Sequence, residues 1–227
     1  MITLTASYFA NSTFGGDTST LSTPSFTPAN GEVIVVKATT WDTGTPSGTP
    51  SGGGLTYTQR QESAPGGFTG YATVFTATVS GSPGSMAVTL SAPGSSCHHA
   101  MVVERWSGAT LAATPATIDT IHGVGPGNVF STTITTTGTN SIVTWANYDN
   151  DSRDTTGRAY FSGATEDGIS DGHLVSAGVM YFAYQSAASP GSQTVGMSAP
   201  TSQNWTVAGI EVLEAATVSR GAFLQFF

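Results

Sequence analysis

Residues 31–41 read GEVIVVKATTW, a glycine turn followed by a run of β-branched and other strand-forming residues. Such side chains favour extended backbone because they pack well on the pleated surface of a sheet. NSIVTWANY (140–148) is also rich in strand-forming residues. In FTGYATVFTATV (68–79) every second residue from Tyr71 to Ala77 falls on the same face of an extended chain. These three stretches predict β-strands.

The composition extends this prediction to the rest of the chain. The 227 residues include 28 glycines, 11 prolines and a large excess of serine and threonine, whereas only 9% are charged and Lys37 is the single lysine. Good helix formers such as Glu, Lys, Leu, Arg and Gln are therefore scarce, and Gly, Ser and Pro favour turns. We expect an all-β protein.

A repeat with a fixed offset of 107 residues organises the sequence. SPGSMAVTLSAPGSS (82–96) matches SPGSQTVGMSAPTSQ (189–203) at nine of fifteen positions. The same offset carries further matches: Phe75 onto Phe182, Val103 onto Ile210, and Glu104 onto Glu211. A match of this length predicts an internal duplication, with halves at about 8–110 and 111–217.

Both halves contain the same series of predicted strands. In the third strand of the first half, alternation places Tyr71, Thr73, Phe75 and Ala77 on one face. The offset places Gly178, Met180, Phe182 and Tyr184 on the matching face of the second half, where Gly178 could mark a bulge. Short strands with regular turn signals predict a two-layer antiparallel β-sandwich with jelly-roll-like connections and pseudo-twofold symmetry. We expect one fused domain over residues 1–217 rather than two separate sandwiches, because the segment joining the halves lacks the charged character of a free linker.

The quoted stretches resemble a known family of β-sandwich modules. GEVIVVKATTW, GYATVFTATVSGSPGSMAVTLS, MVVERWSG and NWTVAGIEVLE, which lie within about residues 30–215, are similar to a jelly-roll-like module of minor tail and other virion proteins of phages of actinobacteria. The module also occurs in some bacterial surface proteins. The resemblance implies a structural or adhesive role and supplies no catalytic residues.

The net charge and the cysteine content limit the classes of partner and the cellular locations that we expect for the protein. A net charge of −8 argues against nucleic acid, whose phosphates need a basic face, and against anionic membrane surfaces. Cys97 is the single cysteine, which excludes an internal disulfide, and the sequence shows no signal peptide and no membrane span. A Ser/Thr/Gly-rich protein of this kind is expected on a virion assembled in the host cytoplasm. The alternatives are a processed fragment and signal-free export.

Two patterns raise the question of catalysis. GISDG (168–172) places Ser170 in a Gly-x-Ser-x-Gly pattern, but a strand rather than a helix is predicted to follow, which favours a glycine-rich turn. Glu104 and Glu211 occupy equivalent repeat positions and could form a glycosidase pair. A structural role is favoured for Glu104, which as a partly buried carboxylate needs donors nearby. The scarce candidate cations are Arg60, Arg105 and Arg158. We expect no enzymatic activity.

Metal sites are the next alternatives. Asp149, Asp151 and Asp154 lie close together in YDNDSRDTT and could hold calcium, although a hydrated acidic loop without a metal is the favoured interpretation. Cys97, His98 and His99 lack the paired spacing of structural zinc sites. We expect no cofactor, with calcium as the alternative.

The C-terminal segment 218–227 is apolar. Phe223, Leu224, Phe226 and Phe227 crowd the last five positions, where polar, frayed ends are usual. We expect this tail to dock into a neighbouring subunit or partner, or else to fold back onto its own sandwich. The sequence thus predicts a non-enzymatic virion surface protein, either a minor tail protein or a capsid decoration protein, which binds other virion proteins and copies of itself.

The runner-up function is a carbohydrate-binding adhesion module. Its sugar-binding face would use Trp41, Trp106, Trp145, Trp205 and the tyrosines, and its ligand would be a host surface glycan. Packing in the core is the alternative use of these aromatic side chains.

Overall fold

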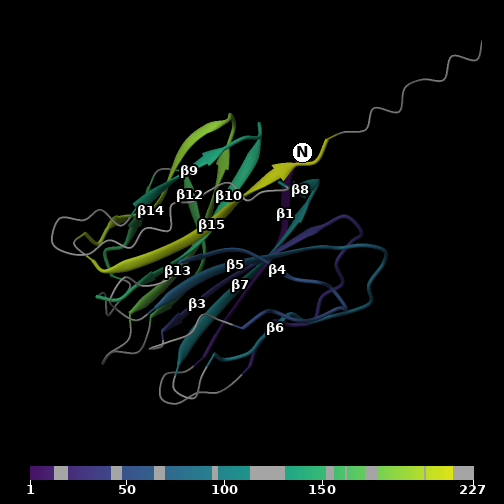
Figure 1. Cartoon of the computed structure of the whole chain (residues 1–227), viewed down its shortest axis with the longest axis horizontal. Helices are drawn as coiled ribbons and strands as arrows, with labels where there is room; N and C mark the ends of the chain where they lie inside the picture. Colours follow the sequence, from purple (N-terminus) through teal and green to yellow (C-terminus); the bar gives the residue numbers. More distant parts are fainter. Residues whose placement is uncertain are drawn as a thin grey trace, which may run out of the picture.

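The computed structural model describes residues 1–12, 20–41, 48–63, 70–93, 97–112, 131–151, 156–161, 163–171, 178–201 and 203–216. Every regular element among them is a β-strand, and all pairings between strands are antiparallel (Figure 1). The predicted all-β sandwich class is confirmed.

Two five-stranded sheets form the body of the molecule. The first has the order β1 (Thr3–Asn11), β7 (His98–Ser107), β3 (Val33–Trp41), β5 (Tyr71–Thr78) and β4 (Thr58–Ser63). The second has the order β12 (Ala164–Asp171), β13 (Val179–Ala187), β10 (Ser141–Asp149), β15 (Trp205–Glu214) and β8 (Ala109–Leu111). In Figure 1 the first half of the chain, purple to teal, packs against the second half, green to yellow.

Two smaller sheets accompany the large ones. One pairs β2 (Leu21–Ser22) with β6 (Thr89–Leu90), and the other orders β11 (Ala159–Tyr160), β14 (Gly191–Ala199) and β9 (Ser131–Thr136). Their apolar residues share cores with the outer faces of the first and second large sheets, respectively. The sandwich therefore has a further layer on each side, which the sequence did not predict.

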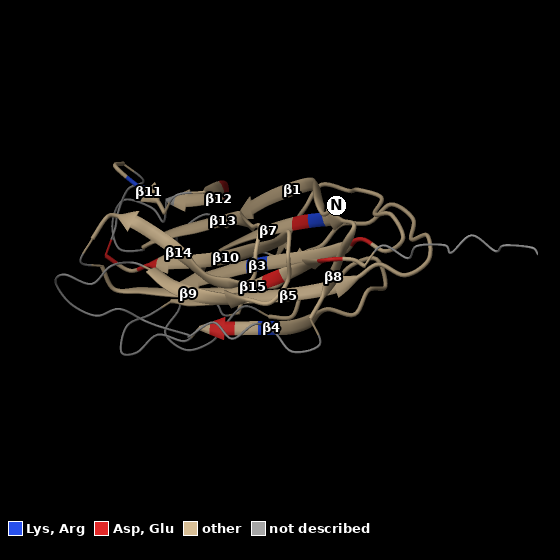
Figure 2. Cartoon of the chain, turned by 90° about the horizontal axis from the view of Figure 1, so that it is seen from above, with Lys and Arg blue, Asp and Glu red and all other residues tan. Residues whose placement is uncertain are grey.

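Three apolar cores correspond to these layers. The central core lies between the large sheets and contains Val35 and Val102 from the first half and Phe182 and Ile210 from the second. Because both faces of the large sheets are covered, β10 is buried along its whole length, and β3 is buried except at Trp41. Runs of apolar residues without strict alternation are the sequence pattern of such doubly buried strands. Charged residues are few along the ribbon, and on β7 an acidic and a basic residue stand next to each other (Figure 2).

The strand orders of the two halves correspond. The order β1-β7-β3-β5-β4 in one large sheet is matched by β8-β15-β10-β13-β12 in the other.

The offset of 107 nevertheless does not preserve which face a residue occupies. Phe75 lies in the outer core of the first half, whereas its counterpart Phe182 lies in the central core. The descent of the halves from a duplicated segment stays a prediction.

Candidate functional site

A buried cluster of charged side chains joins the two halves in the central interface. Lys37 on β3 places its Nζ 2.7 Å from Glu104 Oε1 on β7, and 2.8 and 2.9 Å from Asp167 Oδ1 and Oδ2 on β12. The side chains of Lys37 and Glu104 are completely buried, and that of Asp167 is 3% exposed. Asp167 comes from the second half of the chain and the other two residues from the first, so the cluster connects the facing sheets.

Neutral donors and acceptors complete the cluster. Trp106 Nε1 donates to Glu104 Oε2 at 2.9 Å, and Thr144 Oγ1 on β10 lies 2.8 and 3.0 Å from the two Glu104 oxygens. Lys37 Nζ also donates to the carbonyl oxygen of Ala183 at 3.2 Å, and Ser7 Oγ donates to Asp167 Oδ2 at 3.3 Å. This network meets the requirement that buried charges be paired and hydrogen-bonded.

Strand pairing explains why these side chains meet. Val33 and Val35 lie in the central core, so Lys37, two residues further along β3, points into the same interface. The β12–β13 register shifts between Glu166 and Gly168, which leaves Asp167 as an extra residue whose side chain turns inward.

Gly168 permits the close approach of β12. A Cβ at this position would lie 2.5 Å from Val102 Cγ2 and 2.8 Å from Phe9 Cδ2. A larger residue would push β12 away from β7 and β1, and with it Asp167 from Lys37.

Burial strongly affects Glu104. Desolvation raises the pKa of its carboxyl group from 4.5 to about 7, against the opposing attraction of Lys37 and with a further increase from Asp167. Glu104 can therefore exchange a proton near neutral pH.

The arginine partners predicted for Glu104 are wrong, although the expectation of neighbouring donors was sound. Arg105 NH2 lies 2.7 Å from Glu32 Oε2, and Arg158 Nε lies 2.7 Å from Glu166 Oε2. These two arginines therefore form ion pairs outside the cluster, and Lys37 is the cation that pairs with Glu104. Arg60 Nε likewise donates to Thr76 Oγ1. The available signal was Lys37 itself, a single charge inside the apolar run VIVVKATTW.

Glu211 has a different environment from Glu104. It accepts hydrogen bonds from the backbone N–H groups of Thr137 and Gly138 and from Thr137 Oγ1, at 2.9–3.0 Å. Burial raises its pKa, but these hydrogen bonds outweigh burial and leave the pKa below its usual value. Glu211 thus fastens the turn before β10, and the two glutamates have no hydrogen-bond partner in common.

Ser170 lies in strand β12 rather than in the predicted glycine-rich turn. Its Oγ is 3.3 Å from His98 Nε2 and accepts a hydrogen bond from Asn11 Nδ2 at 3.2 Å. This Ser–His contact was not among the sites predicted from the sequence. Ser170 is 1% exposed and His98 is 2% exposed, so the pair is covered by the packed sheets.

Two of the three aspartates proposed for calcium accept hydrogen bonds from backbone groups. Asp149 is buried and its Oδ1 accepts from the Asp151 N–H at 3.0 Å, while Asp151 Oδ2 accepts from the Asn204 N–H at 2.7 Å. Asp154 lies outside the described residues.

The described part of the chain contains no group of three His, Cys, Asp or Glu side chains suited to a metal ion. Cys97, His98 and His99 are all buried.

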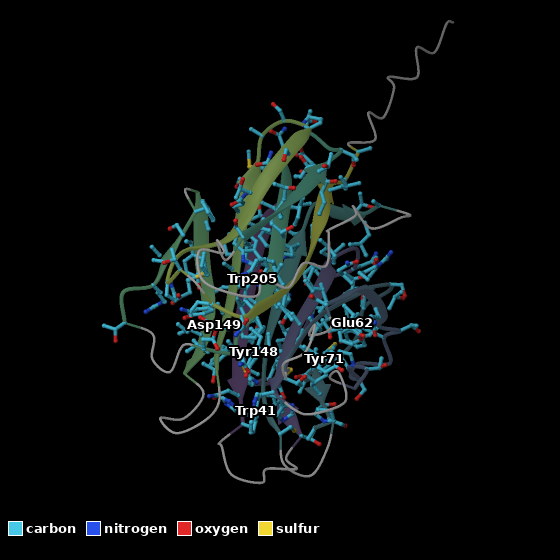
Figure 3. All side chains as sticks on the ribbon, turned by 60° about the vertical axis from the view of Figure 1, so that its left-hand side comes forward. Trp41, Glu62, Tyr71, Tyr148, Asp149 and Trp205 are labelled. Carbon is cyan, nitrogen blue, oxygen red and sulfur yellow. The ribbon has the colours of Figure 1, made fainter. Side chains whose placement is uncertain are left out.

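Most tryptophans lie inside the protein. Trp106, Trp145 and Trp205 are at most 2% exposed, whereas Trp41 is partly buried at the end of β3 (Figure 3). Tyr148 is buried at the end of β10, and its hydroxyl accepts from the Gly178 N–H at 3.2 Å. The core-packing interpretation therefore holds for these three tryptophans.

The tail residues Phe223, Leu224, Phe226 and Phe227 lie outside the described residues. Within the described ranges, no helix is long and apolar enough to cross a membrane.

Comparison with known proteins gave no relative. The scan against protein-family models, the search of curated proteins and the search of solved structures each found no match.

Proposed function

We propose that the protein is a non-enzymatic structural component of a bacteriophage particle, exposed on its surface as a minor tail protein or a capsid decoration protein. The observation that carries the proposal is that the side chains able to act as nucleophiles, acids or bases are buried. Lys37, Glu104 and Ser170 are at most 1% exposed; Lys37 and Glu104 bind each other, and Ser170 contacts the buried His98. Groups placed in this way stabilise a body rather than contact a substrate.

The composition of the chain supports the same proposal. Few charges are available, and the chain is rich in hydroxyl-bearing and small residues. The resemblance to β-sandwich modules of virion proteins is the reason for proposing a phage particle as the location. In this proposal the segment 218–227 anchors the protein to other virion proteins or to copies of itself, and the sandwich projects outward.

The test is to locate the protein on purified particles of the phage that encodes it. Immunogold labelling with antibodies against the folded sandwich is expected to decorate the head or the tail, and mass spectrometry of gradient-purified particles is expected to detect the chain. Deletion of 218–227 is expected to abolish incorporation while the deleted protein remains folded in solution. Absence of the full chain from particles would refute the proposal, and normal incorporation of the deleted chain would refute the anchoring role.

The adhesion-module alternative predicts a different result. With three tryptophans buried, a sugar-binding face would depend on partly buried aromatic residues such as Trp41 and Tyr71 (Figure 3). A glycan array separates the two functions, because specific micromolar binding that is lost in Trp41→Ala would favour the module.

A further inference from the structure

The Lys37–Glu104–Asp167 cluster has an unusual composition for a structural ion network. It uses the only lysine of a chain that has few cations, and it places two carboxylates around that one ammonium group. A buried ion pair is expensive to desolvate, and replacement by apolar residues is often neutral or stabilising. Electrostatic pairing alone therefore does not account for the buried cluster, and a reaction between its groups would.

We propose that Lys37 and Asp167 condense to form an intramolecular isopeptide bond, with Glu104 transferring the protons. The new bond joins Lys37 Nζ to Asp167 Cγ, one Cγ–O bond breaks, and one water molecule leaves. An ammonium group and a carboxylate are thereby converted into a neutral secondary amide. The reaction requires no oxidant, no reductant and no additional reactant.

The atoms are positioned for this reaction. Lys37 Nζ lies 2.8 and 2.9 Å from the two Asp167 oxygens, which places Asp167 Cγ roughly 3 Å away, at the separation of a near-attack arrangement. Rotation of the Asp167 carboxyl group about its Cβ–Cγ bond then presents the face of the carbonyl to the amine.

Glu104 contacts the nitrogen that must lose protons. Its Oε1 lies 2.7 Å from Lys37 Nζ, so it can accept the first proton and produce the neutral amine that attacks Cγ. The same carboxyl group then gives that proton to the departing oxygen. It transfers the second nitrogen proton in the same way, so Glu104 ends in its starting state and the two protons leave in the water.

The surroundings keep Glu104 in place and favour the product. Trp106 and Thr144 donate to its carboxylate at 2.8–3.0 Å, and burial raises its pKa to about 7, within reach of both protonation states. In water the reverse hydrolysis dominates, but the packed sheets exclude water here. Condensation also removes two unit charges from a medium that solvates charge poorly.

The bond would link the two halves of the sandwich. Residues 37 and 167 are 130 positions apart and belong to facing sheets, so the amide would close a long loop across the central core. Loop closure of this length restricts the unfolded chain strongly. For a chain with one cysteine it would supply the covalent cross-link that a disulfide cannot.

The first test is the intact mass of the purified, folded full-length protein. The expected mass is lower than the sequence mass by one water molecule, after allowance for removal of Met1. A mass equal to the sequence mass in folded protein would overturn the proposal. This measurement needs no variant.

Lys37 as the only lysine provides a second test. A lysine-specific protease added to the denatured protein is expected to leave the chain uncut, because the amide blocks the side chain that the protease recognises. Digestion with another protease is expected to give one branched peptide containing residues 37 and 167. Cleavage after Lys37 into two fragments would contradict the bond.

Variants separate the proposed roles. Lys37→Arg and Asp167→Ala are expected to have their full sequence masses. Glu104→Gln keeps both reacting groups and is also expected to have its full mass, with circular dichroism checking that it folds. Asp167→Asn is expected to form the same amide with loss of ammonia, so its mass is lower by one ammonia rather than by one water. Loss of water from folded Glu104→Gln at the wild-type rate would remove Glu104 from the mechanism.

Discussion

Replacing Glu104 by glutamine is expected to change how stability depends on pH. Burial raises the pKa of this carboxyl group from 4.5 to about 7 in the folded protein. The folded state therefore binds its proton more tightly than the unfolded state, and the resulting stabilisation is fully present below pH 4.5. As the pH rises from about 4.5 to about 7, that stabilisation is lost.

The expected magnitude follows from the size of the shift. One pKa unit corresponds to about 1.4 kcal/mol, so the wild-type protein should lose on the order of 3 kcal/mol relative to Glu104→Gln over this interval. Glutamine preserves the shape of the side chain and leaves Lys37 paired with Asp167. Condensation of these two residues would leave Glu104 as the titrating group of the cluster, so the sign is the same with or without the amide.

Urea unfolding followed by tryptophan fluorescence, at half-unit steps from pH 4 to pH 8, measures the effect. Subtracting the free energy of unfolding of one protein from that of the other cancels the pH dependence of the titratable groups that both proteins share. The difference is expected to change in favour of Glu104→Gln as the pH rises. Parallel curves for the two proteins would refute the reasoning, and so would a change of the opposite sign.

Further substitutions test the packing around the cluster. Gly168→Ala should destabilise the protein by about 1–3 kcal/mol in urea unfolding, because its Cβ would overlap Val102 and Phe9; an unchanged midpoint would contradict the close approach of β12. Phe182→Ala, which leaves a cavity in the central core, should cost about 3–5 kcal/mol, and a loss below 1 kcal/mol would show that the two sheets do not share this core. Glu211→Gln should lower stability above pH 5, and the loss should shrink as the pH falls below 4.5, since hydrogen bonds hold the pKa of Glu211 below that usual value; a loss that stays constant with pH would contradict this.

The central strands of the large sheets could be predicted because their signals are local, whereas β1 was not predicted and the end of β12 was predicted to be a turn. The runs 31–41 and 140–148 correspond to β3 and β10, and alternation correctly placed Tyr71, Thr73, Phe75 and Ala77 on one face of β5. The outer layers were missed because coverage of an outer face depends on packing between distant segments, which no local pattern reports.

The cluster could be predicted only in part. Glu104 was expected to have donors nearby, but its partner depends on a bulge in β12 and on a contact between residues 130 positions apart. Neither follows from spacing along the chain. The pattern GISDG did not predict the environment of Ser170 for the same reason. Ser170 and His98 lie on strands of different sheets and come into contact only because the two sheets pack face to face.

The central claim is that both halves form one body joined through the Lys37 cluster. Native-state hydrogen exchange at increasing urea concentration tests it most directly, with β3 reporting on the first half and β10 on the second. The slowest amides of both strands are expected to exchange with the same free energy and the same urea dependence, equal to those of global unfolding. If one strand lost its protection at a clearly lower urea concentration, the halves would unfold separately and the account would be contradicted.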